Sequence, residues 1–145
     1  MKLSSVVYKV GCWSFVLVGL GHIVTSMLIP NTPERVKMVQ EMKSFSISMP
    51  GTESNLYLFH EGFSLMMGLL LTAYGLLNLA FAKISKMPVK SVMLINVAVS
   101  LSALIISIKY FFIVPVAFLG VAFLCFLIAL ALSFQSMNYS KEKHG

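Results

Sequence analysis

Hydrophobic residues fill four long stretches of the chain, at about residues 6–29, 56–82, 91–108 and 113–135. Each stretch is near or above the roughly 20 residues that an α-helix needs to cross the apolar core of a bilayer. Lipid offers the backbone no hydrogen-bond partners, so such segments must be helical. The pattern therefore predicts an all-α membrane protein, a bundle of four transmembrane helices in a single membrane domain over residues 1–145.

The connection between the third and fourth stretches is short. Residues 109–112 (KYFF) leave room only for a tight turn, and Pro115 then falls in the first turn of the fourth helix, where no amide hydrogen bond is lost. The chain begins like a signal peptide, with lysines before apolar residues, but no A-x-A-like cleavage site follows. We therefore expect a retained first span.

One sizeable loop, residues 30–55, separates the first two spans. Thr32 is a natural N-cap and Pro33 fits the first helical position, so residues 31–45 are predicted to form a short helix. Apolar residues recur every third position among charged ones, at Val36, Val39, Met42 and Phe45. This pattern predicts an amphipathic helix in the membrane interface, followed by a turn at Pro50-Gly51.

The composition supports a membrane location. Of the residues, 58% are hydrophobic and 11% are charged, whereas soluble domains typically carry about 25% charged residues. The net charge of +6 could indicate a nucleic-acid partner, but the eleven Lys and Arg residues are scattered beside apolar stretches. They form no basic patch, so no nucleic-acid partner is expected.

The basic residues instead predict the orientation of the spans. With four spans, both termini share a side with the loop between spans two and three, and that side holds Lys2, Lys9, Lys83, Lys86, Lys90, Lys141 and Lys143. The opposite side holds Arg35, Lys37, Lys43 and Lys109. The richer side is predicted to be cytoplasmic. Both termini would then lie on the cytoplasmic side of a bacterial inner membrane, and residues 30–55 on the opposite side.

Three ionisable side chains lie inside the outer part of the predicted spans. At 1.5 Å per residue, His22 lies roughly 12 Å from Pro30, and His60 roughly 7–8 Å inward from Asn55. Spans one and two are antiparallel neighbours, so His22, His60 and Glu61 should share one depth and form a polar chamber. Burying such groups costs several kcal/mol unless they are paired or hydrated. The structural alternative is that His60 or Glu61 extends to the headgroups.

Small residues should bring spans one and two close together. Ser64 follows Glu61 by three positions and His60 by four, so it lies under both. Two stripes of small or polar residues are predicted to face each other, Ser64, Gly68, Thr72 and Gly75 against Gly19, His22 and Ser26. They allow tight packing of the two helices. At the outer end of this contact, the same two helix faces would form the walls of the polar chamber. The predicted ligand-binding residues are therefore His22, Ser26, His60, Glu61 and Ser64.

Glu61 is the only acidic residue within the four spans. The nearest cations expected are His60, His22, and the loop residues Arg35, Lys37 and Lys43. If the loop helix covers the outer end of the chamber, one of these basic chains could reach Glu61 and hold the helix there as a lid.

Metal and haem are not expected as cofactors. Adjacent helical residues diverge by about 100°, so His60 and Glu61 cannot easily face one ion. A haem between His22 and His60 would need a wide slot, whereas the small residues favour close packing. Cys12 and Cys125 form no CxxC or CxxCH motif. Asn78 and Asn96 approach the cytoplasmic end and could hydrogen-bond each other as structural contacts.

Several short segments resemble a known family. Gly21-His22, Met42-Lys43-Ser44-Phe45 and Gly62-Phe63-Ser64-Leu65 are similar in spacing to those of small uncharacterised bacterial four-helix integral membrane proteins, over about residues 15–75. Members tend to carry Trp-Asp-Phe-Tyr where this chain has Tyr57-Leu58-Phe59-His60, so the acid here lies at Glu61. The resemblance implies the fold and the membrane location, and no established activity.

Three kinds of function remain open. The chain could be a binding or accessory module for a lipid-like or quinone-like ligand, for a membrane-protein partner or for a second copy of itself. The alternative is a membrane redox or acid–base enzyme that uses His22, His60 and Glu61. A transport element is the third hypothesis, but neither an inverted repeat nor a broken helix supports it. No motif pairs a nucleophile with a base, so we expect the binding module.

Overall fold

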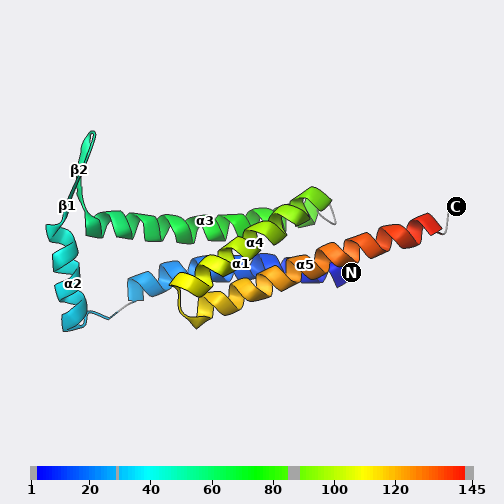
Figure 1. Ribbon diagram of the computed structural model, residues 1–145, viewed down its shortest axis with the longest axis horizontal. Helices are drawn as coiled ribbons and strands as arrows, with labels where there is room; N and C mark the ends of the chain where they lie inside the picture. The colour runs from blue at the N-terminus through cyan, green and yellow to red at the C-terminus, as the bar shows by residue number, and fades with distance from the viewer. Residues whose placement is uncertain (1–2, 29, 85–88, 143–145) are drawn as a thin grey trace. The chain divides into compact units, whose positions relative to one another are not determined.

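The computed structural model describes residues 3–28, 30–84 and 89–142. Within these residues the chain forms five α-helices and one β-hairpin, in the order shown in Figure 1. The elements are α1 (Leu3–Leu28), α2 (Pro33–Ser44), β1 (Ser46–Met49), β2 (Thr52–Asn55), α3 (Leu56–Ile84), α4 (Lys90–Tyr110) and α5 (Ile113–Glu142).

Four of the helices are long and apolar enough to cross a membrane. They are α1, α3, α4 and the Ile113–Gln135 part of α5. The prediction of an all-α protein with four such helices is therefore confirmed. The helices run a few residues beyond the predicted spans, most at the C-terminal end, where α5 continues to Glu142. Polar residues can continue a helix past the apolar core, so hydropathy marks the core rather than the end of the helix.

The predicted loop helix is present as α2. Thr32 is its N-cap, and the Thr32 hydroxyl accepts a 3.3 Å hydrogen bond from the amide of Arg35. No described residue of α2 is buried, and among its apolar positions only Val39 and Met42 are partly covered. Its placement in the membrane interface on the extracytoplasmic side stays a prediction.

A β-hairpin follows α2, where the sequence predicted only a turn. Strands β1 and β2 pair antiparallel, with Met49 opposite Thr52. Pro50 and Gly51 form the turn, and Gly51 adopts a φ of 86°. This is the positive-φ position that follows proline in a type II turn, and it requires glycine.

The chain divides into two compact units. One comprises residues 1–18 and 71–145, here called the core unit, and the other comprises residues 19–70, here called the loop unit. Because α1 and α3 each run through the boundary, both units contain a pairing of these two helices. The predicted single domain stays a prediction, and each unit is described by itself.

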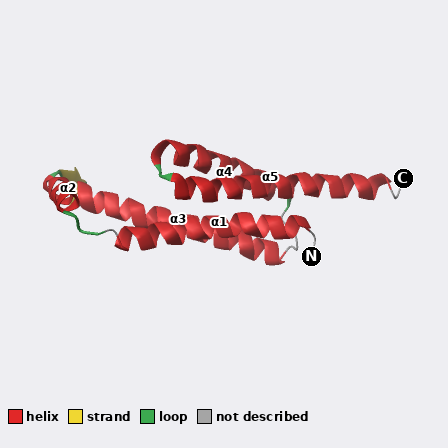
Figure 2. Ribbon diagram, turned by 90° about the horizontal axis from the view of Figure 1, so that it is seen from below, coloured by secondary structure: helices red, strands yellow, loops and turns green. Residues whose placement is uncertain are grey.

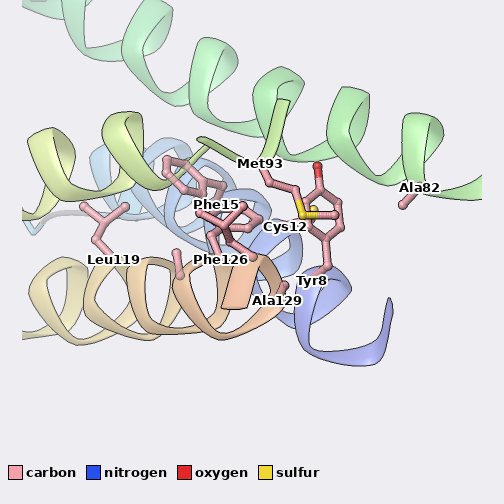
Figure 3. Close-up of a cluster of buried hydrophobic side chains, with 10 residues drawn as sticks. Tyr8, Cys12, Phe15, Ala82, Met93, Leu119, Phe126 and Ala129 are labelled. Atoms are coloured by element: carbon pink, nitrogen blue, oxygen red, sulfur yellow. The ribbon is translucent and has the colours of Figure 1, made fainter. Parts of the chain in front are cut away.

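The core unit encloses a cluster of buried side chains from α1, α3, α4 and α5 (Figure 3). Aromatic rings dominate it: the Phe126 ring lies 5.3 Å from that of Tyr8 and 6.2 Å from that of Phe15. Phe15 also meets Tyr74 edge to face at 4.9 Å. These ring contacts join α1, α3 and α5, and Met93 brings α4 into the same cluster.

Helices α4 and α5 form an antiparallel hairpin, visible as two adjacent red helices in Figure 2. Only Phe111 and Phe112 separate them, and Pro115 lies in the first turn of α5, as predicted. At the other end of the hairpin, the Lys90 ammonium lies 4.1 Å from the centroid of the Phe134 ring. This cation–π contact joins the first turn of α4 to the late part of α5.

The covered face of α3 follows a heptad spacing. Its covered residues recur at alternating intervals of four and three, at Tyr57, Glu61, Ser64, Gly68, Leu71, Gly75, Asn78 and Ala82, all of them buried or half-buried. Helix α1 carries a matching series, at Tyr8, Cys12, Phe15, Gly19, His22 and Ser26. This spacing is typical of helices that pack along their length, and we call the two series the α1–α3 seam.

Glycine lets α1 and α3 approach closely along the seam. In the core unit, a Cβ built at Gly75 would lie 2.7 Å from the backbone oxygen of Cys12. In the loop unit, a Cβ at Gly68 would lie 2.5 Å from Cγ1 of Ile23 and 3.0 Å from the backbone oxygen of Gly19. The predicted tight contact between the first two spans is therefore confirmed.

Candidate functional site

The candidate site is the polar part of the α1–α3 seam in the loop unit. His22 on α1 and Ser64 on α3 are hydrogen-bonded, with 2.8 Å between Nε2 and Oγ. Both side chains are half-buried. The contact follows from the heptad series, because it places His22 and Ser64 on the two facing sides of the helix pair.

The seam closes directly beyond this pair. Gly68 follows Ser64 by one helical turn, and an added Cβ there would meet both Ile23 and the backbone of Gly19. Towards the start of α3, the same face carries Glu61 and then Tyr57, both half-buried. The polar residues are therefore grouped at the end of the seam where α2 and the hairpin connect α1 to α3. On the side of the group away from this connection, the close packing at Gly68 leaves no room between the helices.

Tyr57 links α3 to α2. Its side chain is hydrogen-bonded to that of Glu61, one turn further along the helix. The ammonium of Lys43 lies 5.1 Å from the centroid of the Tyr57 ring, and the charge of Arg35 acts on the same tyrosine. Both cations belong to α2. At the start of α3, a carboxylate and an aromatic ring thus meet one cation of α2, Lys43, and the charge of a second, Arg35, also acts on the tyrosine.

His60 lies on a different face of α3 from Glu61. It is exposed, whereas Glu61 is half-buried, because adjacent residues of a helix point about 100° apart. Next to it, the rings of Phe59 and Phe63 form an exposed pair with centroids 4.7 Å apart. Ser64 rather than His60 therefore occupies the position opposite His22.

The five predicted site residues are thus placed in two groups. His22, Ser64 and Glu61 lie on the seam, and His60 lies outside it. Ser26 also belongs to the seam, and its hydroxyl donates to the backbone oxygen of Ile23 at 2.8 Å. That these residues form a ligand site stays a prediction.

Tyr57 is the site residue that sequence analysis missed. It precedes Glu61 by four residues and Ser64 by seven, so the heptad interval could have found it. The contact between α2 and α3 that the structure shows is Lys43 over the Tyr57 ring. That a basic side chain of α2 reaches Glu61 and holds a lid stays a prediction.

A second polar cluster lies in the core unit. Tyr8 donates to Oδ1 of Asn78 at 2.7 Å, and Nδ2 of Asn96 donates to the Tyr8 hydroxyl and to the same Asn78 oxygen at 2.7 and 2.8 Å. Tyr74 donates to Oδ1 of Asn96. The predicted contact between Asn78 and Asn96 is confirmed, and the two tyrosines extend it to three helices. Because these groups satisfy one another while buried, they stabilise the packing.

Within residues 3–28, 30–84 and 89–142, no group of three or more His, Cys, Asp and Glu side chains is close enough to hold a metal ion. Cys12 is buried, Cys125 is half-buried, and both are free thiols.

Comparison with known proteins gives no match: no family model, no curated protein and no solved structure matches this chain. The resemblance to small bacterial four-helix membrane proteins therefore stays a hypothesis. Any function has to be argued from the two polar clusters themselves.

Proposed function

We propose that the protein is a non-enzymatic membrane module that binds a lipid-like molecule at the polar part of the α1–α3 seam. In this proposal Glu61, Ser64, His22 and Ser26 contact the polar group of the ligand, and His60 lies beside it on the outer face of α3. The observation that carries the proposal is the hydrogen bond between His22 and Ser64.

The depth of this pair supports a binding role. Six residues separate His22 from the end of α1 at Leu28, and eight separate Ser64 from the start of α3 at Leu56. At 1.5 Å per residue the pair lies roughly 9–12 Å inside the helices, below the expected headgroup level. Polar groups at this depth are costly unless they are partnered, and they are default candidates for function.

The surroundings favour an amphiphilic ligand. The polar series Tyr57, Glu61 and Ser64 runs inward along one face of α3, and the exposed rings of Phe59 and Phe63 lie on a neighbouring face. A lipid could place its polar group against the first face and its chains along the second. A purely apolar ligand would leave Glu61 without a polar contact from the ligand.

The proposal is tested by measuring the lipid that remains bound after purification. Native mass spectrometry of the detergent-solubilised protein should detect bound lipid, and Ser64→Ala or His22→Gln should reduce it several-fold. Ser102→Ala is the matched control, because Ser102 is an exposed serine of α4 in the core unit. Equal retention by all four proteins, or no retention by any, would refute the proposal.

A second candidate function follows from the same contact. A serine hydroxyl 2.8 Å from a histidine nitrogen has the separation of a nucleophile and its general base. A membrane hydrolase would use Ser64 to attack an ester and His22 to accept its proton. A fluorophosphonate probe, which reacts with activated serines, should then label the protein and fail to label Ser64→Ala. Absence of labelling in the unsubstituted protein would remove this candidate.

The orientation belongs to the same proposal. In it, both termini are cytoplasmic and α2 and the hairpin lie outside a bacterial inner membrane, which is supported by the excess of basic residues, seven against four, on the side of the termini. Of these residues, Lys2, Lys86 and Lys143 lie outside the described part of the chain. The binding site would then face the outer leaflet.

A further inference from the structure

We infer that the start of α3 recognises the primary ammonium group of an amine-bearing phospholipid, and that Lys43 holds this ammonium position in the structure. The inference rests on the proposed function and names its ligand class. It follows from Tyr57, which lies beside the Lys43 side chain, from Glu61, which is hydrogen-bonded to Tyr57, and from their position at the start of α3.

Tyr57 and Glu61 together present the groups that bind an ammonium ion. The Lys43 nitrogen lies 5.1 Å from the centroid of the Tyr57 ring, within the range of a cation–π contact. Glu61 is hydrogen-bonded to the same tyrosine and supplies a carboxylate on the covered face of α3. A ring face beside an acid is selective for a cation, and a primary ammonium can also donate hydrogen bonds to the acid.

The position along the helix matches a lipid headgroup. Tyr57 and Glu61 lie one and five residues after the start of α3 at Leu56, so they occupy roughly the first 8 Å of the span. The headgroups of a bilayer lie at this level, at the edge of the apolar core. A cation-binding site here meets the amine of a membrane lipid at far higher local concentration than any amine dissolved in water.

Arg35 provides the second half of the recognition. Its charge acts on Tyr57, and its Nη1 donates a 3.1 Å hydrogen bond to Oδ1 of Asn31. In an ethanolamine phospholipid, the phosphate is two carbons from the amine. A guanidinium binds phosphate well, so Arg35 would take the phosphate while the amine lies over Tyr57.

Because Lys43 occupies the ammonium position, two substitutions should have opposite effects on binding of the lipid amine. Lys43 is tethered to α2 and competes with the lipid amine, so Lys43→Gln should strengthen amine binding. Glu61→Gln removes the carboxylate and should weaken it. A lysine that served only as a structural contact would give no such opposition.

The experiment uses the full protein in vesicles that contain equal amounts of phosphatidylethanolamine and phosphatidylglycerol with the same chains. Both carry a phosphate, but only the first carries an ammonium, and the second therefore has a net negative charge. After mild solubilisation, the ratio of the two lipids that stay bound is measured by native mass spectrometry. The unsubstituted protein should retain the amine lipid in excess. Lys43→Gln should raise that excess about 2- to 5-fold, the change expected for release of one competing cation–π contact.

Glu61→Gln should abolish the excess, and so should Tyr57→Leu, which serves as a second variant if the first folds poorly. Lys37→Gln is the matched control, because Lys37 is an exposed lysine of α2 that carries the same charge. It should leave the ratio unchanged. An unchanged or lower excess in Lys43→Gln, or the same rise in Lys37→Gln, would overturn the inference.

Two further outcomes separate this inference from the proposed function. If lipid is retained and Ser64→Ala releases it, but the amine is not preferred, only the headgroup assignment fails. If no lipid is retained at all, the proposed function fails as well. Soluble phosphoethanolamine is added in a parallel sample, and displacement of the lipid at equal concentration would assign the site to a dissolved amine and overturn the lipid source.

Discussion

His22 and Ser64 are hydrogen-bonded at the same register that pairs Tyr8 with Asn78. Fourteen residues separate His22 from Tyr8, and fourteen separate Ser64 from Asn78, which is two heptads on each helix. Each unit therefore contains one polar pair between α1 and α3, and each pair specifies an antiparallel alignment of the two helices within its own unit. Within a unit, a slip of either helix by one residue would break that unit's pair, so the pair fixes the local register as well as contributes stability.

The glycines of the seam should be intolerant of even one added carbon. Gly75→Ala would place a Cβ 2.7 Å from the backbone oxygen of Cys12, and that oxygen cannot move without shifting α1. We expect a loss of about 1–3 kcal/mol in the free energy of unfolding, as for overpacked cores. Titration of the helical circular dichroism with denaturant in detergent micelles measures it.

Gly21→Ala and Gly62→Ala are the matched controls. At either position an added Cβ meets none of the described residues within 4 Å, so the substitution adds no clash. Alanine has a higher helix propensity than glycine, and stability should stay constant or rise by up to about 1 kcal/mol. If Gly75→Ala behaved like these two variants, the close approach of α1 and α3 would be wrong.

The polar cluster of the core unit should respond in proportion to the number of bonds removed. Tyr8→Phe removes two hydrogen bonds, the one donated to Asn78 and the one accepted from Asn96, while Asn78 and Asn96 keep their mutual bond, so we expect a loss of about 1–3 kcal/mol. Asn96→Ala removes the partner of Tyr8, Tyr74 and Asn78 at once and should cost more. The same denaturant titration ranks the two, and Ser102→Ala should be neutral. Equal losses for both variants would show that Asn96 is not the centre of the cluster.

The sequence predicted the elements whose signals are local. Four apolar stretches specified the spans, because no other structure can satisfy the backbone in lipid. Thr32 and Pro33 predicted the start of α2, and this signal is also local because helix capping depends only on neighbouring residues. The hairpin was missed because each strand has only four residues: Ser46–Met49 alternates polar and apolar residues over too short a stretch to predict a strand, and Thr52–Asn55 has no apolar residue.

The site was only partly predictable because its signal is a spacing between distant residues. A stripe at intervals of four, through Ser64, Gly68 and Thr72, follows the surface of a single straight helix. Two helices that pack along their length use alternating intervals of four and three, which adds Tyr57 and Leu71 to the covered face beside the half-buried Thr72. This geometry also leaves His60 outside the seam, although its neighbour Glu61 lies on it.

The proposed orientation can be tested with two single cysteines. Ser46→Cys lies on the exposed hairpin and Ile84→Cys at the exposed end of α3. If residues 30–55 are outside, a membrane-impermeant maleimide should label the first in intact cells and the second only after permeabilisation. The unsubstituted chain gives the background from Cys12 and Cys125. Labelling of Ile84→Cys alone in intact cells would reverse the orientation.

The contact between Lys43 and Tyr57 should restrain α2. No described residue of α2 is buried, so few contacts oppose its local unfolding, and the contact of Lys43 with the Tyr57 ring joins it to α3. Tyr57→Leu removes the ring face, and we expect trypsin to cleave after Arg35, Lys37 and Lys43 about 2- to 5-fold faster, as for the loss of an exposed cation–π contact. Glu61→Gln should raise cleavage less, because the tyrosine ring remains.

The control for this prediction is Leu58→Ala, one residue further along α3. Leu58 is exposed and lies on another face of the helix, so its substitution changes the same turn without touching the contact. Mass spectrometry of the digests locates each cut, which separates faster cleavage in α2 from general unfolding, because general unfolding would also speed cleavage after Lys109, which lies within the folded helix α4. Equal cleavage rates after Arg35 and Lys37 in Tyr57→Leu, Leu58→Ala and the unsubstituted protein would mean that Tyr57 does not hold α2. Lys43 would then be a surface lysine that lies over the ring without stabilising the helix.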